Sequence, residues 1–200
     1  KVDTLLIGED KRKRMNGFIR KNALAGGQTY IVCPLVDESD REELKSVTEF
    51  AETLRTATFP DLKVGFLHGR MKSADKEREM GAFARGETQI LVSTTVIEVG
   101  VNVPAATIMV IENAERFGLS QLHQLRGRVG RGSDKSYCIL ISSDGRETER
   151  LRVMTETNDG FEVARRDLLI RGPGDFFGRR QHGLPKMHIA NLSRAGDLDL

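Results

Sequence analysis

The chain has 200 residues, 38% of them hydrophobic and 30% charged, which is the composition of a water-soluble globular protein. Its formal net charge of +2 is too small for the whole surface to attract nucleic acid, so any DNA contact must come from a local cluster of basic residues. The longest apolar stretch, residues 90–111, is interrupted by Glu98, Asn102 and Pro104, which excludes a membrane span, and we expect a cytoplasmic protein.

Short apolar runs and amphipathic segments alternate along most of the chain. The apolar runs predict strands over residues 30–33, 63–67, 89–92, 107–111 and 137–141, and helical spacing predicts helices over 10–25, 42–54, 75–83 and 119–125. In the first helix we expect Met15, Phe18, Ile19 and Leu24 to face the core. We interpret residues 2–7 as a segment that enters from an earlier part of a longer protein. The alternation predicts an α/β fold, a mostly parallel sheet with flanking helices.

The last third of the chain has a different pattern. Residues 147–157 are spaced as a charged helix with Leu151 and Met154 facing inward, and Asp159-Gly160 breaks it before a second helix over 161–170. We therefore expect residues 1–146 to form the α/β domain, and residues 147–200 to form a helical hairpin, a loop and a C-terminal tail.

Metal-binding patterns are absent from the sequence. Cys33 and Cys138 stand in apolar runs and are expected to be buried thiols. The four histidines lack the spacing of a zinc site. We expect no metal site built by these residues.

Residues 121–131 carry the most specific motif, Gln-Leu-His-Gln-Leu-Arg-Gly-Arg-Val-Gly-Arg. Arg128 and Arg131 stand beside glycines, which leave their guanidinium groups unobstructed. A guanidinium is charged at every working pH and fits phosphate oxygens with two parallel hydrogen bonds. The alternative is an ordinary basic helix end, and short motifs of this kind do occur by chance.

A second motif lies about thirty residues upstream. Residues 90–104 begin as an apolar strand and then break into hydroxyl residues, a glycine and a proline. At the carboxyl end of a parallel strand, Thr94 and Thr95 would present hydroxyls and backbone N–H groups to phosphates. Taken singly, both threonines are also explained by strand propensity.

Together the two motifs resemble motifs V and VI of superfamily 2 nucleic-acid helicases. Three further blocks, residues 93–100, 110–121 and 171–183, narrow the resemblance to the RecG family of ATP-dependent DNA helicases. Residues 32–39 and 66–71 resemble that family's motif IV and the strand end that follows it. The resemblance covers nearly the whole chain and implies the second RecA-like lobe of a P-loop NTPase motor, followed by the family's helical hairpin and loop.

The resemblance implies a shared ATP site. ATP would lie between a first lobe and this one, with Arg128 and Arg131 at its γ-phosphate and Gln124 helping to position it. Gly100 and Asn102 would reach the ribose or the arginines. Many relatives have Asp in place of Asn102, and the amide keeps an acceptor oxygen but loses the charge. No Gly-x-x-x-x-Gly-Lys-Ser/Thr loop occurs in these residues, so Mg²⁺ would be held mainly by the first lobe and this chain alone is expected to be inactive.

The resemblance also implies contacts to duplex or branched DNA. Thr94, Thr95, His68 and Gly69 would follow the DNA backbone, a contact that does not depend on sequence and weakens with salt. In the family, the hairpin and the following loop couple lobe movement to the DNA, and the matching polar residues are Arg150, Arg171 and Gln181. The alternative is a static set of salt bridges. Its acidic partners would be Glu149, Asp167 and Asp175.

The remaining expectations concern partners. The first lobe and a wedge domain would belong to the same polypeptide, which we expect to be a monomer associated with the bacterial nucleoid, acting on stalled forks and Holliday junctions in repair and recombination. One alternative is the same lobe in a transcription-repair coupling factor, which displaces stalled RNA polymerase. Another is a stand-alone DNA- or protein-binding domain, which a phosphate-binding loop upstream would exclude.

Overall fold

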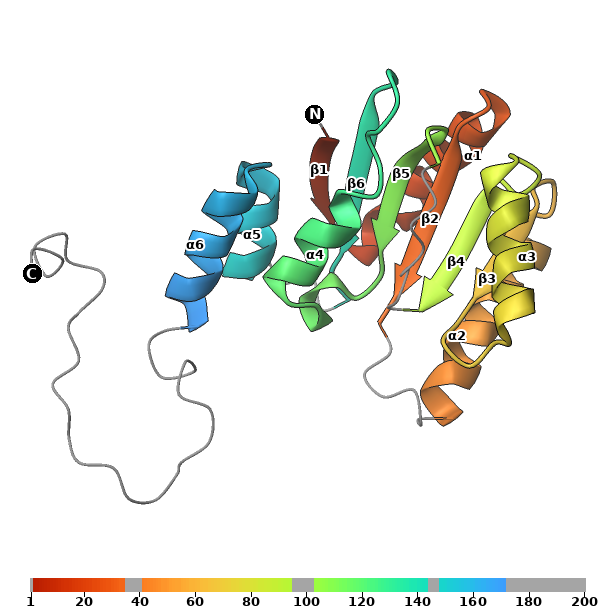
Figure 1. Ribbon diagram of the computed structural model, residues 1–200, viewed down its shortest axis with the longest axis horizontal. Coiled ribbons are helices and arrows are strands. Elements are labelled where there is room, and N and C mark those ends of the chain that lie inside the picture. Colours follow the sequence, from red (N-terminus) through yellow and green to blue (C-terminus); the bar gives the residue numbers. More distant parts are fainter. Residues whose placement is uncertain (1, 35–40, 95–102, 144–147, 172–200) are drawn as a thin grey trace, which may run out of the picture. The chain divides into compact units, whose positions relative to one another are not determined.

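A six-stranded parallel sheet forms the centre of the protein in the computed structural model, which describes residues 2–34, 41–94, 103–143 and 148–171 (Figure 1). The strand order is β1-β6-β5-β2-β4-β3. The strands are β1 (Val2–Ile7), β2 (Gln28–Cys33), β3 (Val64–Leu67), β4 (Ile90–Thr94), β5 (Ala106–Ile111) and β6 (Ser136–Ile141). The parallel α/β fold predicted from the alternating pattern is confirmed.

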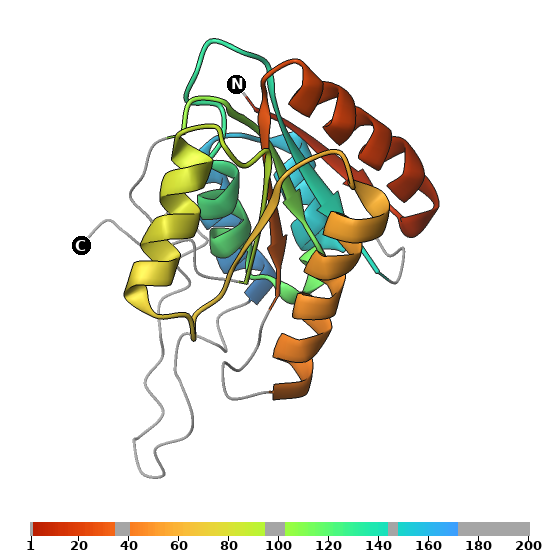
Figure 2. The ribbon, with the colours of Figure 1, turned by 90° about the vertical axis from the view of Figure 1, so that its right-hand side faces the viewer.

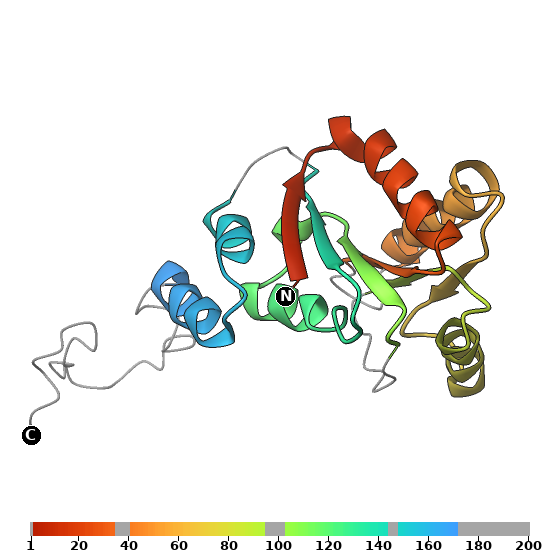
Figure 3. The same ribbon diagram turned by 90° about the horizontal axis from the view of Figure 1, so that it is seen from above.

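Helices cover both faces of this sheet. They are α1 (Arg12–Leu24), α2 (Arg41–Thr53), α3 (Ser73–Ala84), α4 (Leu119–Arg126), α5 (Glu149–Glu156) and α6 (Gly160–Arg171). The buried side chains of α1 and α2 join one hydrophobic core, and those of α3, α4, α5 and α6 join the other. Figures 2 and 3 show α1 and α2 on one side of the sheet and α3 and α4 on the other. The fold is therefore a three-layer sandwich.

Each central strand supplies both cores, because successive side chains of a strand point to opposite faces. On β5, Ile108 and Val110 face α1 and α2, whereas Met109 and Ile111 face the layer that contains α4. All four are fully buried. This explains why β5 appears in the sequence as an unbroken apolar run, as expected of a parallel strand covered on both faces.

The structure adds a strand at the start of the chain and corrects the core-facing positions of the first helix. Residues 2–7 form an edge strand, β1, which pairs with β6 over its whole length. On α1 the core-facing positions are Met15, Ile19 and Ala23, which follow one another every four residues, so Leu24 is 74% exposed. Phe18 is 36% exposed and packs edge to face on Tyr137, with ring centroids 5.1 Å apart.

The helical hairpin begins where the sequence predicts it. The Thr148 hydroxyl caps α5 by accepting a hydrogen bond from the Leu151 N–H at 3.3 Å. Leu151 and Met154 are fully buried, as expected, and Val163 of α6 joins the same core as α4. Residues 1–170 form one compact unit, and the domain boundary after residue 146 stays a prediction.

Both cysteines are buried free thiols, as expected. Burial raises the pKa of Cys138 to about 12, so its thiol stays protonated at neutral pH. Among the residues that the structure describes, no helix is long and apolar enough to cross a membrane. The same residues contain no group of three or more histidine, cysteine, aspartate or glutamate side chains placed to hold a metal ion.

Candidate functional site

The predicted DNA contacts gather at the carboxyl edge of the sheet. Thr94 is the last residue of β4, opposite Cys33 of β2, and Leu67 of β3 pairs with Ser93, so His68 and Gly69 leave the sheet next to Thr94. The Thr94 side chain is buried, whereas His68 and Gly69 are partly exposed. Three of the four predicted contacts therefore lie together, and the fourth, Thr95, is outside the described residues.

A tight turn fixes the backbone after β3. The Met71 N–H donates to the His68 carbonyl at 3.2 Å, and the Lys76 ammonium donates to the Gly69 carbonyl at 2.6 Å. The His68 ring also packs on Phe66, with ring centroids 5.3 Å apart. These contacts hold residues 68–71 in one conformation. A fixed turn suits the predicted contact to the DNA backbone, whose phosphates are regularly spaced.

The arginine motif lies at the opposite, amino edge of the sheet. The helix α4 starts after β5 and runs back across the sheet, and the segment that follows it meets the beginnings of three strands. A Cβ on Gly130 would lie 2.7 Å from the Val2 side chain of β1, and one on Gly132 would lie 2.9 Å from the Pro104 carbonyl, just before β5. Ser136, the first residue of β6, is also next to Gly130. The structure thus separates the arginines from the turn that carries the predicted DNA contacts by the length of the sheet.

Arg131 and Gln124 are exposed, and Arg128 is half-buried. The Nε of Arg131 donates to the Gly127 carbonyl at 3.3 Å, which leaves its two terminal nitrogens without a described partner in the part of the chain that the structure covers. Burial raises the pKa of Tyr30 to about 12, while Arg128 and Arg131 act in the opposite direction. Tyr30 and Val129, the residue that follows Arg128, belong to the same hydrophobic core, on the face of β2 that carries α4.

Gly130 is expected to be essential for this arrangement. Its φ of +78° is in the left-handed region, and a Cβ would collide with Val2. Gly130→Ala should lower the free energy of unfolding by about 2 kcal/mol and displace both arginines, as measured by thermal unfolding and ATP hydrolysis of the full-length protein. Gly127→Ala is the control because Gly127 has helical backbone angles and room for a methyl group. Equal losses in the two variants would contradict this prediction.

Arg126 is a buried residue of the motif whose role was not predicted from the sequence. Its side chain is 3% exposed, and its Nη1 donates to the carbonyls of Met154 and Thr157, each at 2.8 Å. These carbonyls end α5, where the last turn of a helix lacks intrahelical donors and carries negative partial charge. Arg126 therefore caps α5 and fastens the arginine motif to the helical hairpin.

His123 completes this contact. Its Nδ1 lies 3.0 Å from Nη2 of Arg126, and its Nε2 faces Gly160 at the start of α6. Because arginine is always a donor, the Nδ1 atom must accept, which requires a neutral ring. Burial, followed by the charge of Arg126, lowers the pKa of His123, and Asp159 acts in the opposite direction.

A pH dependence follows from the lowered pKa of His123. Above about pH 6.5 the ring is neutral in both folded and unfolded chains. As the pH falls below that value, the unfolded chain takes up a proton that the folded chain resists, so the free energy of unfolding should decrease. Chemical denaturation between about pH 8 and about pH 5 should show a smaller decrease in the free energy of unfolding for His123→Gln than for the wild type. The same change in this free energy with pH in both proteins would contradict the prediction.

The predicted coupling residues are only partly described. Arg150 donates to the Phe117 carbonyl at 3.5 Å, and Arg171 is the exposed last residue of α6. Within the hairpin, Arg166 bonds both Glu156 of α5 and Glu162 of α6 and so ties the two helices together. Gly100, Asn102 and Gln181 lie outside the described residues.

Comparisons with known proteins agree with the motifs. Residues 10–133 match the family model of the helicase conserved C-terminal domain. Residues 157–199 match a second model, the C-terminal part of domain 3 of the ATP-dependent DNA helicase RecG. The second model names RecG and therefore favours RecG over the coupling factor.

Individual proteins similar to this chain are also named RecG. The chain is 52% identical to the ATP-dependent DNA helicase RecG of Thermotoga maritima and 48% identical to that of Bacillus subtilis, covering 96% of this chain in each case. It spans about a quarter of their length, 25% and 28% respectively.

Solved structures show the same fold. A structure of RecG bound to a three-way DNA junction matches 88% of this chain and 23% of its own, with a TM-score of 0.74 and 48% identity. Saccharomyces cerevisiae Dbp5 bound to RNA and ADP BeF3 has a TM-score of 0.54 at 16% identity, covers 77% of this chain and 37% of its own, and shows the fold alone. The chain therefore belongs to the helicase conserved C-terminal domain family and, within it, to the RecG helicases.

Proposed function

We propose that the full-length protein is an ATP-dependent helicase that moves along duplex DNA and remodels branched structures, such as stalled forks and Holliday junctions, in repair and recombination. This chain is its second motor lobe. The observation that supports the proposal most strongly is that two elements suited to bind phosphate lie at opposite edges of one sheet. Arg128 and Arg131 stand at the amino edge, and the His68-Gly69 turn stands at the carboxyl edge.

At the amino edge, the residues fit a nucleotide that is held mainly by the first lobe. Arg131 is exposed and its terminal nitrogens can form two parallel hydrogen bonds with phosphate oxygens. Arg128 would add a second cation, Gln124 would orient the phosphate chain, and Gly100 with Asn102 would lie near the ribose. Mg²⁺ would neutralise charge on the phosphates from the first-lobe side. The positive charge of Arg131 would stabilise the charge that develops during hydrolysis.

At the carboxyl edge, His68, Gly69, Thr94 and Thr95 would contact the phosphates of the DNA backbone. Closure of the two lobes would move this edge along the duplex. The movement of the lobes would be coupled to the DNA through the hairpin and its loop. The residues of this coupling would be Arg150, Arg171 and Gln181.

The first lobe and a wedge domain of the same polypeptide would complete the motor, which would act as a monomer on DNA in the cytoplasm.

The test is ATP hydrolysis by the full-length protein with and without a three-way DNA junction, together with unwinding of that junction. The proposal predicts that DNA stimulates hydrolysis and that the junction is unwound only with ATP. Hydrolysis without unwinding would favour displacement of RNA polymerase instead. Binding of DNA without any hydrolysis would contradict the proposal and leave a binding domain.

A further inference from the structure

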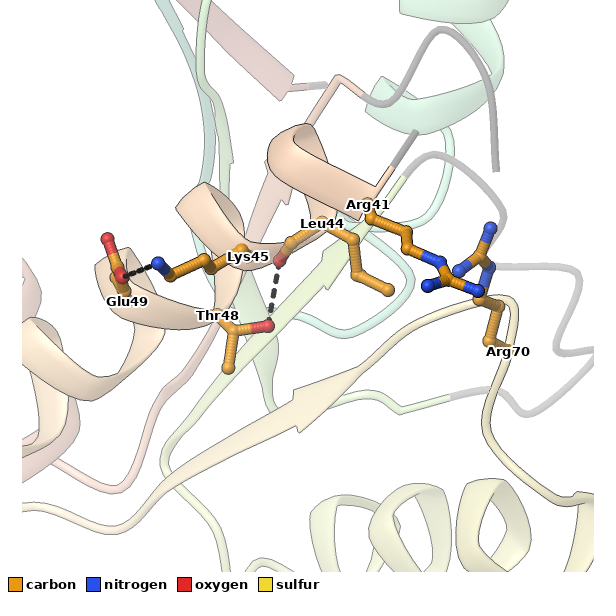
Figure 4. Close-up of a pocket in the computed structure, with 6 residues that line it drawn as sticks. All are labelled: Arg41, Leu44, Lys45, Thr48, Glu49 and Arg70. Carbon is orange, nitrogen blue, oxygen red and sulfur yellow. Dashed lines mark hydrogen bonds and ion pairs between the residues drawn. The ribbon is translucent and has the colours of Figure 1, made fainter. Parts of the chain in front are cut away.

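A surface groove at the carboxyl edge of the sheet carries two arginines that face one another. The groove has a volume of about 320 Å³ and lies between the first turns of α2 and the turn after β3. Figure 4 shows the guanidinium groups of Arg41 and Arg70 side by side, one from each element. Both side chains are exposed.

The positive charges of Arg41 and Arg70 are not neutralised by the other residues that line the groove. Lys45 lies 3.8 Å from Glu49, so these two side chains offset one another. Arg41 and Arg70 form no hydrogen bond or ion pair with any residue that the structure describes. Two adjacent guanidinium groups repel, and an anion between them removes the repulsion and gains charge-assisted hydrogen bonds.

A second cavity at the same edge of the sheet contains arginines whose charges are neutralised by carboxylates. It has a volume of about 270 Å³ and lies between the ends of β2 and β5. There Arg12 bonds Glu112 at 2.7 Å and Glu9 at 2.6 Å, and Arg116 bonds Glu43 at 2.6 Å. These arginines are matched to carboxylates and stabilise the fold. Arg41 and Arg70 differ from them because, among the described residues, no carboxylate pairs with either.

We propose that Arg41 and Arg70 form a clamp for one phosphate of the DNA backbone. The proposal rests on the proposed function and extends it, since neither residue belongs to the predicted contacts. Arg70 is held at the tip of the turn formed by residues 68–71, directly after His68 and Gly69. Arg41 is the first residue of α2, whose buried Val47 and Ala51 anchor the helix on the sheet. The clamp therefore continues the line of the expected backbone contacts.

The position of the clamp identifies the source of the phosphate. The arginines expected to meet ATP are at the amino edge, separated from this groove by the length of the sheet. One nucleotide at the amino edge does not reach both places. A polymer that lies along the carboxyl edge does meet the clamp, and it presents phosphates at regular intervals.

The experiment compares duplex DNA binding by the full-length wild type and Arg41→Gln/Arg70→Gln in the absence of ATP. The matched control is Arg78→Gln/Arg85→Gln, which removes the same charge from two exposed, ion-paired arginines on and after α3. Each lost phosphate contact should lower the slope of log Kd against log salt by about 0.9. Between about 50 and about 200 mM salt, the double variant should therefore lose roughly three- to fourfold less affinity than the wild type. The charge-conserving variant Arg41→Lys/Arg70→Lys should keep most of the wild-type slope.

Three results would overturn the clamp. The first is a wild-type slope and Kd in Arg41→Gln/Arg70→Gln. The second is the same change in the control variant, which would indicate net charge alone. The third is a rise in the KM for ATP with unchanged DNA binding, which would make the nucleotide the source of the phosphate. Thermal unfolding confirms that each variant is folded. DNA binding without ATP is read separately from hydrolysis, so failure of the clamp and failure of the helicase proposal are distinguishable.

Discussion

Replacing Arg131 with alanine in the full-length protein is expected to lower the rate of ATP hydrolysis by about 10³-fold to 10⁵-fold. Arg131 is exposed at the amino edge, and its only described hydrogen bond, among the residues that the structure covers, goes from Nε to the Gly127 carbonyl. Truncation therefore leaves no buried polar group unpaired, and the fold should be unaffected. Steady-state hydrolysis with saturating DNA measures the effect, and thermal unfolding measures the stability.

Two further variants sharpen this prediction. Arg131→Lys keeps the charge but loses the two parallel hydrogen bonds, so its rate should lie between wild type and Arg131→Ala. Lys135→Ala removes a cation from the same loop, and because Lys135 pairs with Asp3 at the surface, its rate should stay near wild type. Wild-type hydrolysis by Arg131→Ala would show that the arginine does not contact the phosphates.

Replacing Arg126 with leucine should have the largest effect on stability, a loss of about 3 kcal/mol around α4 and α5. The substitution keeps an apolar stem but removes the donors to the carbonyls of Met154 and Thr157, which are then unpaired at the end of α5, the first buried and the second half-buried. Hydrogen exchange of the α4 and α5 amides in the full-length protein measures this local loss directly. Arg126→Lys should recover part of it, because one ammonium reaches fewer acceptors.

The control for this prediction is Arg165→Leu on α6. Arg165 is exposed and bonds only Glu162 among the described residues, at 2.8 and 2.9 Å, so its loss should change stability by less than about 1 kcal/mol. Unchanged exchange rates in Arg126→Leu would mean that the guanidinium does not hold the hairpin to the arginine motif.

Much of the fold could be predicted because burial leaves a local pattern. The central strands are buried on both faces and appear as apolar runs, and the hairpin helices carry buried residues at helical spacing. The edge strand β1 was missed because it pairs with β6, more than a hundred residues later in the chain, and that pairing leaves no local signal.

The site was predicted less completely. Arg126 and Arg128 look alike in sequence, but only Arg126 is on the buried face of α4, seven residues after Leu119 and four after Leu122. That spacing was a usable signal. Arg41 and Arg70 come from different elements, and only the folded chain brings them together. The separation of the residues expected to contact ATP from those expected to contact DNA, at opposite edges of the sheet, also depends on the direction in which α4 crosses the sheet.

The most direct test of the whole account measures ATP hydrolysis and junction unwinding together for the full-length wild type, Arg131→Ala and Gln181→Ala. The account predicts that Arg131→Ala loses both activities, whereas Gln181→Ala still hydrolyses ATP but no longer unwinds the junction. Equal activity of all three proteins in both assays would contradict it.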